Sequence, residues 1–76
     1  MIKTKQEIIE QNICKYFEDD YVQEVKLTSI NTTDTGFYVE GNTLVKIGVD
    51  NYDNGWIAVI LNKDLSVKEI VDEGVC

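Results

Sequence analysis

The segment Asp50–Gly55, DNYDNG, gathers carboxylates, amides and a glycine as a calcium-binding loop does. If Gly55 takes the sixth position of an EF-hand loop, the third position is Tyr52 and the twelfth is Leu61. The motif needs an oxygen ligand and a bidentate glutamate there, and it needs flanking helices where this sequence has strand patterns. We therefore interpret the segment as an acidic turn, and we expect neither a metal site nor a cofactor.

The remaining candidates for catalysis are equally sparse. Histidine is absent, so no side chain has an unperturbed pKa near neutrality. Asp50 and Asp53 flank an expected hairpin tip open to water, where neither burial nor a cation tunes a pKa. Cys14 is expected in the core and Cys76 as a free thiol, because two distant cysteines form no metal or redox motif. With no nucleophile–base pair and no phosphate-binding glycine loop, we expect no enzyme.

Charge is the most informative property of the composition. Fourteen acidic residues stand against seven lysines with no arginine, which gives a formal net charge of −7 over 76 residues. Such a surface repels polyanions and lacks the residue that best contacts phosphate and guanine, which argues against direct nucleic-acid binding. The expected partner is a protein with a basic surface, for example one that binds nucleic acids.

No part of the sequence resembles a membrane or export segment. No apolar run approaches the roughly 18 residues that span a bilayer, and the start of the chain, MIKTKQEIIEQ, lacks the apolar stretch of a secretion signal. We expect a cytoplasmic protein without membrane contact.

The amino-terminal region predicts one amphipathic helix over residues 4–18. Thr4 and Glu7 have the spacing of a capping box, and Ile9, Ile13 and the pair Tyr16-Phe17 recur at helical intervals. Acidic residues then oppose the helix macrodipole and favour a stop. These residues are Glu18, Asp19 and Asp20.

After Tyr21 the apolar period changes from 3.6 to 2, which predicts strands. Short turn-forming links allow only antiparallel neighbours. We therefore expect an α+β fold, one single domain over residues 1–76, in which the helix packs on a five-stranded antiparallel meander. The predicted strands are 22–30, 36–40, 43–50, 56–62 and 66–72, and the predicted turns are Asn31–Thr35, Gly41–Asn42, Asp53–Gly55 and Asn62–Asp64.

The predicted hairpin at Asp53–Gly55 sets the register of the sheet. A three-residue loop closed by Gly55 pairs Tyr52 with Trp56 across the hairpin. The same register pairs Val49 with Val59, Ile47 with Leu61 and Asn51 with Ile57. It gathers one apolar face that the helix can cover. This face consists of Val45, Ile47, Val49, Ile57, Val59 and Leu61.

The other face of the predicted sheet mixes aromatic and acidic side chains, which is common at protein interfaces. Two alternatives remain open, namely cross-strand pairs that only stabilise the sheet, and a second core face closed by self-association. The predicted partner-binding residues are Tyr38, Glu40, Asp50, Tyr52, Asp53 and Trp56, together with Glu18, Asp19 and Asp20.

These expectations favour a small acidic protein-binding module. The first hypothesis is an inhibitor or decoy that imitates nucleic acid and occupies the basic groove of a nuclease or another nucleic-acid-binding protein, as phage anti-defence and immunity-type proteins do. The alternative is a structural or regulatory domain, a homodimer for example, that self-associates through its aromatic face. A small-molecule pocket between helix and sheet is a third hypothesis, although so short a chain leaves little room for one.

Overall fold

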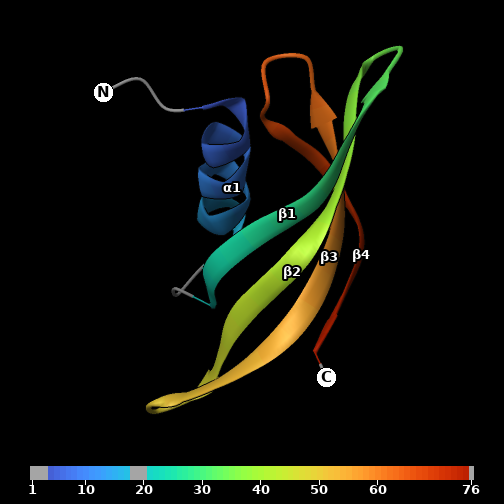
Figure 1. Cartoon of the computed structure of the whole chain (residues 1–76). Helices are drawn as coiled ribbons and strands as arrows, with labels where there is room; N and C mark the ends of the chain where they lie inside the picture. The colour runs from blue at the N-terminus through green and yellow to red at the C-terminus, as the bar shows by residue number, and fades with distance from the viewer. Residues whose placement is uncertain (1–3, 18–20, 76) are drawn as a thin grey trace.

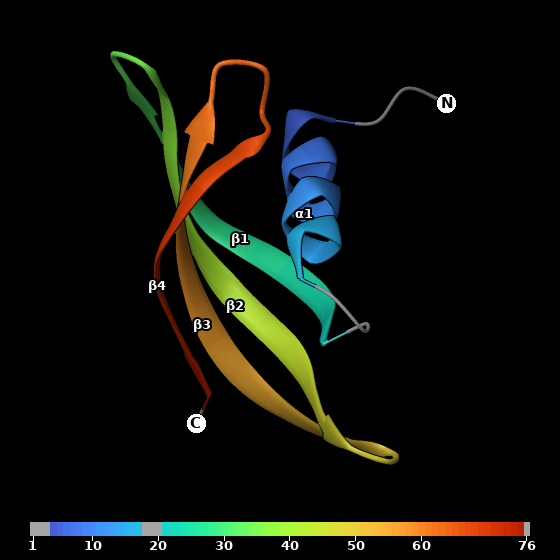
Figure 2. The same ribbon diagram turned by 180° about the vertical axis from the view of Figure 1, so that it is seen from behind.

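The computed structural model describes residues 4–17 and 21–75. Its elements are helix α1 (Lys5–Tyr16) and strands β1 (Val22–Thr33), β2 (Gly36–Gly48), β3 (Asn51–Asn62) and β4 (Val67–Val75). The strands form one antiparallel sheet in the order β1-β2-β3-β4, and α1 packs against one side of it (Figure 1). Seen from behind, the twisted sheet bends around α1 (Figure 2). The described part of the chain is therefore mostly β.

The helix begins where the sequence predicts. The Glu7 amide donates to the Thr4 hydroxyl at 3.2 Å, and the Thr4 amide donates to Glu7 Oε1 at 3.3 Å, so the capping box is confirmed. The helix ends at Tyr16, because Phe17 is extended with φ −92° and ψ 139°. The predicted end at residue 18 is slightly too late, and Glu18–Asp20 lie outside the described residues.

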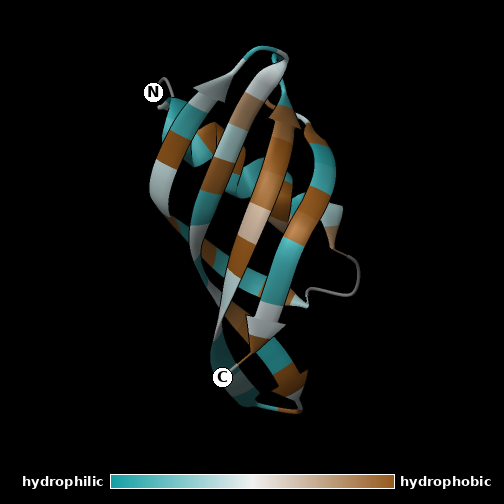
Figure 3. Cartoon of the chain, turned by 90° about the vertical axis from the view of Figure 1, so that its right-hand side faces the viewer, coloured by the Kyte–Doolittle hydropathy of each residue, from teal (hydrophilic) through white to brown (hydrophobic). Residues whose placement is uncertain are grey.

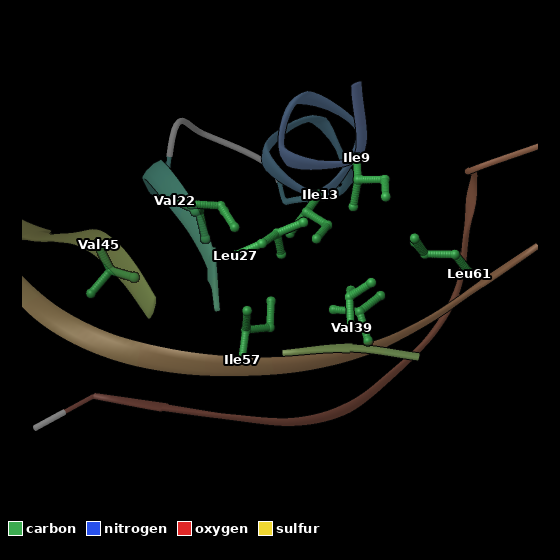
Figure 4. Close-up of a cluster of buried hydrophobic side chains, with 10 residues drawn as sticks. Ile9, Ile13, Val22, Leu27, Val39, Val45, Ile57 and Leu61 are labelled. Carbon is green, nitrogen blue, oxygen red and sulfur yellow. The ribbon is translucent and has the colours of Figure 1, made fainter. Parts of the chain in front are cut away.

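The core lies between α1 and the near side of the sheet. Ile9 and Ile13 are fully buried and point from the helix toward the strands (Figure 4). Val39, Val59 and Leu61 have no exposed surface either. Complete burial of such a side chain stabilises the fold by about 1.5–3 kcal/mol. The rest of this buried cluster is Val22, Val25, Leu27, Val45 and Ile57.

Two polar contacts, one from each half of α1, fix its position. The Lys5 ammonium lies 3.8 Å from the centre of the Phe37 ring, a cation–π contact with β2. Asn12 Nδ2 donates to the carbonyl oxygen of Leu65 at 2.9 Å, which ties the helix to the turn between β3 and β4. The helix therefore contacts the sheet through more than its apolar stripe.

The prediction of five strands is wrong, because the described chain forms four. The predicted strands 36–40 and 43–50 are one strand, β2, and the predicted turn at Gly41–Asn42 lies within it, opposite Leu27 and Lys26. A Cβ at Gly41 would lie 2.6 Å from the Lys26 carbonyl oxygen. Glycine is present here because β1 approaches closely, not because the chain reverses.

The predicted hairpin at Asp53–Gly55 is also wrong. These residues lie inside β3, and the chain reverses at Val49-Asp50, where Asp50 has φ 59°. Tyr52 consequently pairs with Lys46, and Trp56 pairs with Asn42. None of the predicted pairs forms.

The observed register buries a different set of apolar side chains from the predicted one. Val39 pairs with Val59 and Phe37 with Leu61, which places the interior of β3 under the helix. Of the six residues predicted for the helix-covered face, Val45, Ile57, Val59 and Leu61 are buried, but Ile47 and Val49 are 58% and 86% exposed. Because a shift in register moves whole residue sets, the misplaced turn accounts for both errors.

The other links are closer to the prediction. β1 continues to Thr33, so the first turn narrows to Asp34-Thr35, and the turn after Asn62 is confirmed. There the Leu65 amide donates to the Asn62 carbonyl at 2.9 Å, and Asp64 Oδ1 accepts from the Ser66 amide at 3.0 Å. Hydrogen bonds from the Ser66 hydroxyl and amide lower the pKa of the Asp64 carboxyl.

Candidate protein-binding surface

The side of the sheet opposite α1, here called the open face, carries the candidate site. Figure 3 looks onto this face, with the helix behind the strands. Side chains alternate between the two sides of a strand, so the even-numbered residues of β2 and β3 belong to the open face, while Val39, Val45 and Val59 face the helix. Tyr38, for example, shares a cross-strand pair with Ile60 on the open side.

Three neighbouring cross-strand rows make up the centre of the open face. Residues in one row are about 4.8 Å apart from strand to strand, so their side chains are direct neighbours. In the order β2, β3, β4, the rows are Tyr38-Ile60-Glu69, Glu40-Ala58-Asp72 and Asn42-Trp56-Gly74. We call the aromatic and acidic members of these rows, Tyr38, Glu40, Trp56, Glu69 and Asp72, the aromatic–acid patch.

Trp56 is held in one orientation by the neighbouring strand. A Cβ built at Gly74 would overlap the indole ring, so the ring lies directly over the Gly74 backbone. The indole Nε1 also donates to Asp72 Oδ2 at 3.3 Å. Even so, Trp56 is 43% exposed. One side of the ring therefore packs on β4 while the rest is available to a partner.

The patch is negatively charged. Glu40, Glu69 and Asp72 are all exposed, and the Trp56 row continues through Asn42 to one lysine, Lys26 of β1. Glu40 and Asp72 flank Ala58, so their Cα positions are about 10 Å apart, two strand spacings. Ser29 supports Glu40 with a long hydroxyl contact of 3.5 Å to Oε1. The arrangement suits a cationic ligand that meets an aromatic surface between carboxylates.

Three of the predicted partner-binding residues come together in this patch. Tyr38, Glu40 and Trp56 occupy the three adjacent rows, as their shared parity on the open face predicts. Tyr52 lies on the same face and is 49% exposed. It pairs with Lys46 near the end of the β2–β3 hairpin, four residues along β3 from Trp56, a span of about 13 Å.

The remaining predicted residues do not join the patch. Asp50 lies in the turn at the hairpin end, and Asp53 lies on the helix-facing side opposite Val45, where it is half-buried. The Asp53 carboxylate accepts the Asn54 amide at 2.9 Å. The acidic group Glu18–Asp20 lies outside the described residues. Asp50 and Asp53 therefore lie apart from Tyr38, Glu40 and Trp56.

Sequence reasoning missed Glu69 and Asp72 as members of the site. Their position depends on two β-bulges in β4, one between the partners of Ala58 and Val59 and one between the partners of Ile60 and Leu61. A bulge adds a residue without a cross-strand partner and changes which side chains face the same way. The order of polar and apolar residues in β4 does not indicate where the bulges lie.

The end of the β2–β3 hairpin is a second exposed apolar region, here called the hairpin tip and consisting of Ile47, Val49 and Tyr52. The hairpin extends beyond the part of the sheet that α1 covers (Figure 1). Val49 is almost fully exposed, and Ile47 and Tyr52 are about half exposed. Exposed apolar side chains at the end of a hairpin can mark contact with another macromolecule.

An open groove of about 370 Å³ runs between α1 and β1 and includes Cys14, Glu7, Glu10 and Glu24 among its lining residues. Burial, with a smaller contribution from the Glu10 carboxylate, raises the pKa of the Cys14 thiol. The thiol is therefore protonated at neutral pH and weakly nucleophilic. Cys14 packs against the core cluster, consistent with its predicted structural role, while Cys76 lies outside the described residues.

Within residues 4–17 and 21–75, no three metal-ligating side chains come close enough to hold an ion. No helix in these ranges has the length and apolar character needed to cross a membrane. Comparison of the chain with protein-family models, curated proteins and solved structures finds no match. The surface chemistry described above is therefore the basis for assigning a function.

Proposed function

We propose that the protein is a small binding module whose aromatic–acid patch docks onto a basic surface of another protein. The observation that carries this proposal is the geometry of Trp56. Its indole ring packs on Gly74 and donates a hydrogen bond to Asp72, yet the Trp56 side chain keeps almost half of its surface exposed. A pre-oriented aromatic side chain loses little conformational entropy on binding, which makes it a suitable anchor.

The acidic surroundings of Trp56 specify the partner. Glu40, Asp72 and Glu69 attract arginine or lysine side chains, whose cations also bind favourably over an indole ring. The net charge of −7 adds long-range attraction that accelerates encounter with a basic protein. Basic grooves that accept nucleic acids match this description. We therefore propose, as the finer step, that the protein occupies such a groove as a decoy and inhibits a nuclease or another nucleic-acid-binding protein.

Affinity capture with matched variants tests this proposal. The immobilised parent protein is expected to retain a nucleic-acid-binding protein from a host extract at low salt, and an oligonucleotide competitor should displace it. Trp56→Ala combined with Glu40→Gln should weaken capture by about 30-fold, the effect of losing a hot spot of about 2 kcal/mol.

The control is Asp34→Asn combined with Asp50→Asn, which neutralises two exposed carboxylates in turns away from the patch. Capture by this control should stay within about threefold of the parent, since rim charges contribute little affinity. Equal losses in both double variants would reduce the interaction to net charge and contradict a patch-specific site. Retention that an oligonucleotide does not disturb would contradict the decoy step alone.

Self-association is the second candidate function, and the hairpin tip is the observation that favours it. Val49 is 86% exposed beside Ile47 and Tyr52, and a second copy could cover this surface. Light scattering of the parent, Val49→Lys and Trp56→Ala tests the candidate. A dimer that Val49→Lys dissociates would support it, and a monomeric parent at all accessible concentrations would exclude it.

A further inference from the structure

The two outer strands of the sheet differ in how their free edges are covered. Along β1, Glu10 Oε2 of the helix accepts the Leu27 backbone amide at 3.0 Å, and Cys14 receives a hydrogen bond from the Val25 backbone. Glu10 and Cys14, one turn apart on α1, thus accept hydrogen bonds from the Leu27 and Val25 backbone on the outer side of β1. These contacts block the addition of another strand at that edge.

β4 pairs with β3 on one side, and within residues 4–17 and 21–75 no strand lies along its other side. Helix α1 makes a few contacts with β4. The helix reaches this side of the molecule through Asn12, which bonds to Leu65 in the turn before β4. From Asp72 to Val75 the ladder with β3 is regular, so this stretch offers an extended backbone in which alternate amides and carbonyls point away from β3.

The side chains of β4 define the chemistry of a strand that could pair there. Glu69, Asp72 and Glu73 are exposed acids, and Val71 and Val75 are 46% and 36% exposed. β4 also carries Lys68, but its three acids give the strand a net negative charge, so a second copy of β4 would be repelled by like charge. An extended segment that alternates basic and apolar residues has complementary charge and apolar side chains for the two valines.

We propose that β4 accepts an extended basic segment of a partner protein by strand addition at its free edge. The backbone of the segment supplies hydrogen bonds to β4, and its lysine or arginine side chains meet Glu69, Asp72 and Glu73. This mode goes beyond docking on the open face, because its affinity comes partly from main-chain pairing. Strand addition also gives a role to Glu73, which pairs with Ile57 on the helix-facing side and lies outside the aromatic–acid patch.

The test uses three short synthetic peptides with blocked ends and isotope-labelled full-length protein. One peptide alternates lysine with valine, the second alternates lysine with proline, and the third alternates glutamate with valine. Proline keeps the charge but removes donors and disfavours a paired strand. Amide hydrogen exchange of β4 is the readout.

The lysine–valine peptide is expected to slow exchange of amides within Asp72–Val75 by about tenfold or more at saturation, because pairing protects an edge amide. The lysine–proline and glutamate–valine peptides should give no such protection. Glu73→Gln should weaken binding of the lysine–valine peptide by about threefold, as for one exposed charge pair. Glu40→Gln, a change to the patch in β2 that makes no cross-strand pair with β4, should leave the protection intact, which separates this inference from the proposed function of the patch.

Three results would overturn the proposal. The first is equal protection by the lysine–valine and lysine–proline peptides, since charge alone would then explain binding. The second is protection of β1 instead of β4. The third is concentration-dependent protection of β4 without any peptide, which would identify a second copy as the occupant of the edge.

Discussion

Two neighbouring segments, Gly48–Asn51 and Asp53–Gly55, differ in a way that their sequences conceal. Asp53–Gly55 has the stronger turn composition, yet it continues β3 without interruption. The reversal occurs in Gly48–Asn51, where Asp50 takes φ 59° although it is not a glycine. Aspartate tolerates this left-handed conformation better than most residues. The comparison teaches that the burial available to the flanking strands outweighs local turn propensity.

The energetic reason lies in the partners that each reversal creates. A turn at Asp50 pairs Val39 with Val59 and Phe37 with Leu61, beneath α1. A turn at Asn54 would place Val49 there instead and shorten the ladder. Each fully buried aliphatic side chain contributes about 1.5–3 kcal/mol, so burial along the longer ladder outweighs the local preference for a turn at Asp53–Gly55.

The largest expected effect is the loss of stability when apolar residues beside the two segments, Ile57 and Ile47, are replaced by alanine. Ile57→Ala should lower the free energy of unfolding by about 3 kcal/mol, because it leaves a cavity in the core. Ile47→Ala, at a residue 58% exposed, should cost less than about 1 kcal/mol. Urea denaturation measures the free energy of unfolding of both variants. A larger loss for Ile47→Ala than for Ile57→Ala would support the predicted register, in which Ile47 lies under the helix.

Glycine substitutions give the next largest effect. A Cβ at Gly55 would overlap the Gly74 carbonyl oxygen and approach Thr43 Oγ1 to 2.8 Å, so Gly55→Ala should cost about 2–3 kcal/mol. At Gly48 the nearest atom to a new Cβ is 3.5 Å away, so Gly48→Ala should change stability by less than about 0.5 kcal/mol.

Gly55→Asn distinguishes two reasons for glycine at this position, namely the close approach of the β4 backbone and a left-handed turn conformation. Asparagine tolerates a left-handed turn position, but its side chain has no room where the β4 backbone lies close. It should cost as much as Gly55→Ala in the same denaturation assay. An asparagine variant as stable as the parent would mean that Gly55 does occupy a turn.

The parts of the fold that were predictable are those fixed by local chemistry. The capping box of Thr4 and the apolar spacing of Ile9 and Ile13 depend on residues within two helical turns, and both are confirmed. The turn after Asn62 is likewise closed by its own side chains. The shared face of Tyr38, Glu40 and Trp56 was also predictable, because parity survives a wrong turn that shifts register by an even number.

The remainder depended on contacts between distant strands. Gly41 and Gly55 resemble turn markers in the sequence, but each makes room for the backbone of an adjacent strand. Asp72 reaches Trp56 only because β4 contains bulges, which follow from packing rather than from composition. No pattern within one strand encodes these relations, and they decide both the strand count and the acidic half of the patch.

Substitution by valine at the real turn should give a moderate effect. Asp50→Val places a β-branched residue at φ 59° and should lower the free energy of unfolding by about 1–2 kcal/mol. Asp50→Gly removes the same carboxylate without the steric conflict and should stay within about 0.5 kcal/mol of the parent. If both variants are equally stable in thermal unfolding, Asp50 does not adopt the left-handed conformation.

The smallest effect concerns Asn54, an exposed residue that the structure places within β3. Asn54 pairs with Leu44 on the open face, so Asn54→Val gains β propensity and a cross-strand apolar contact. Stability should rise by about 0.5 kcal/mol, measured as a higher urea midpoint at unchanged slope.

Asn42→Val is the matched control, because Asn42 also belongs to a predicted turn but lies in β2 opposite Lys26 and Trp56. Both substitutions should act in the same direction. Destabilisation by Asn54→Val alone would indicate that the chain turns at Asn54 after all, since valine is poorly accommodated in a tight turn.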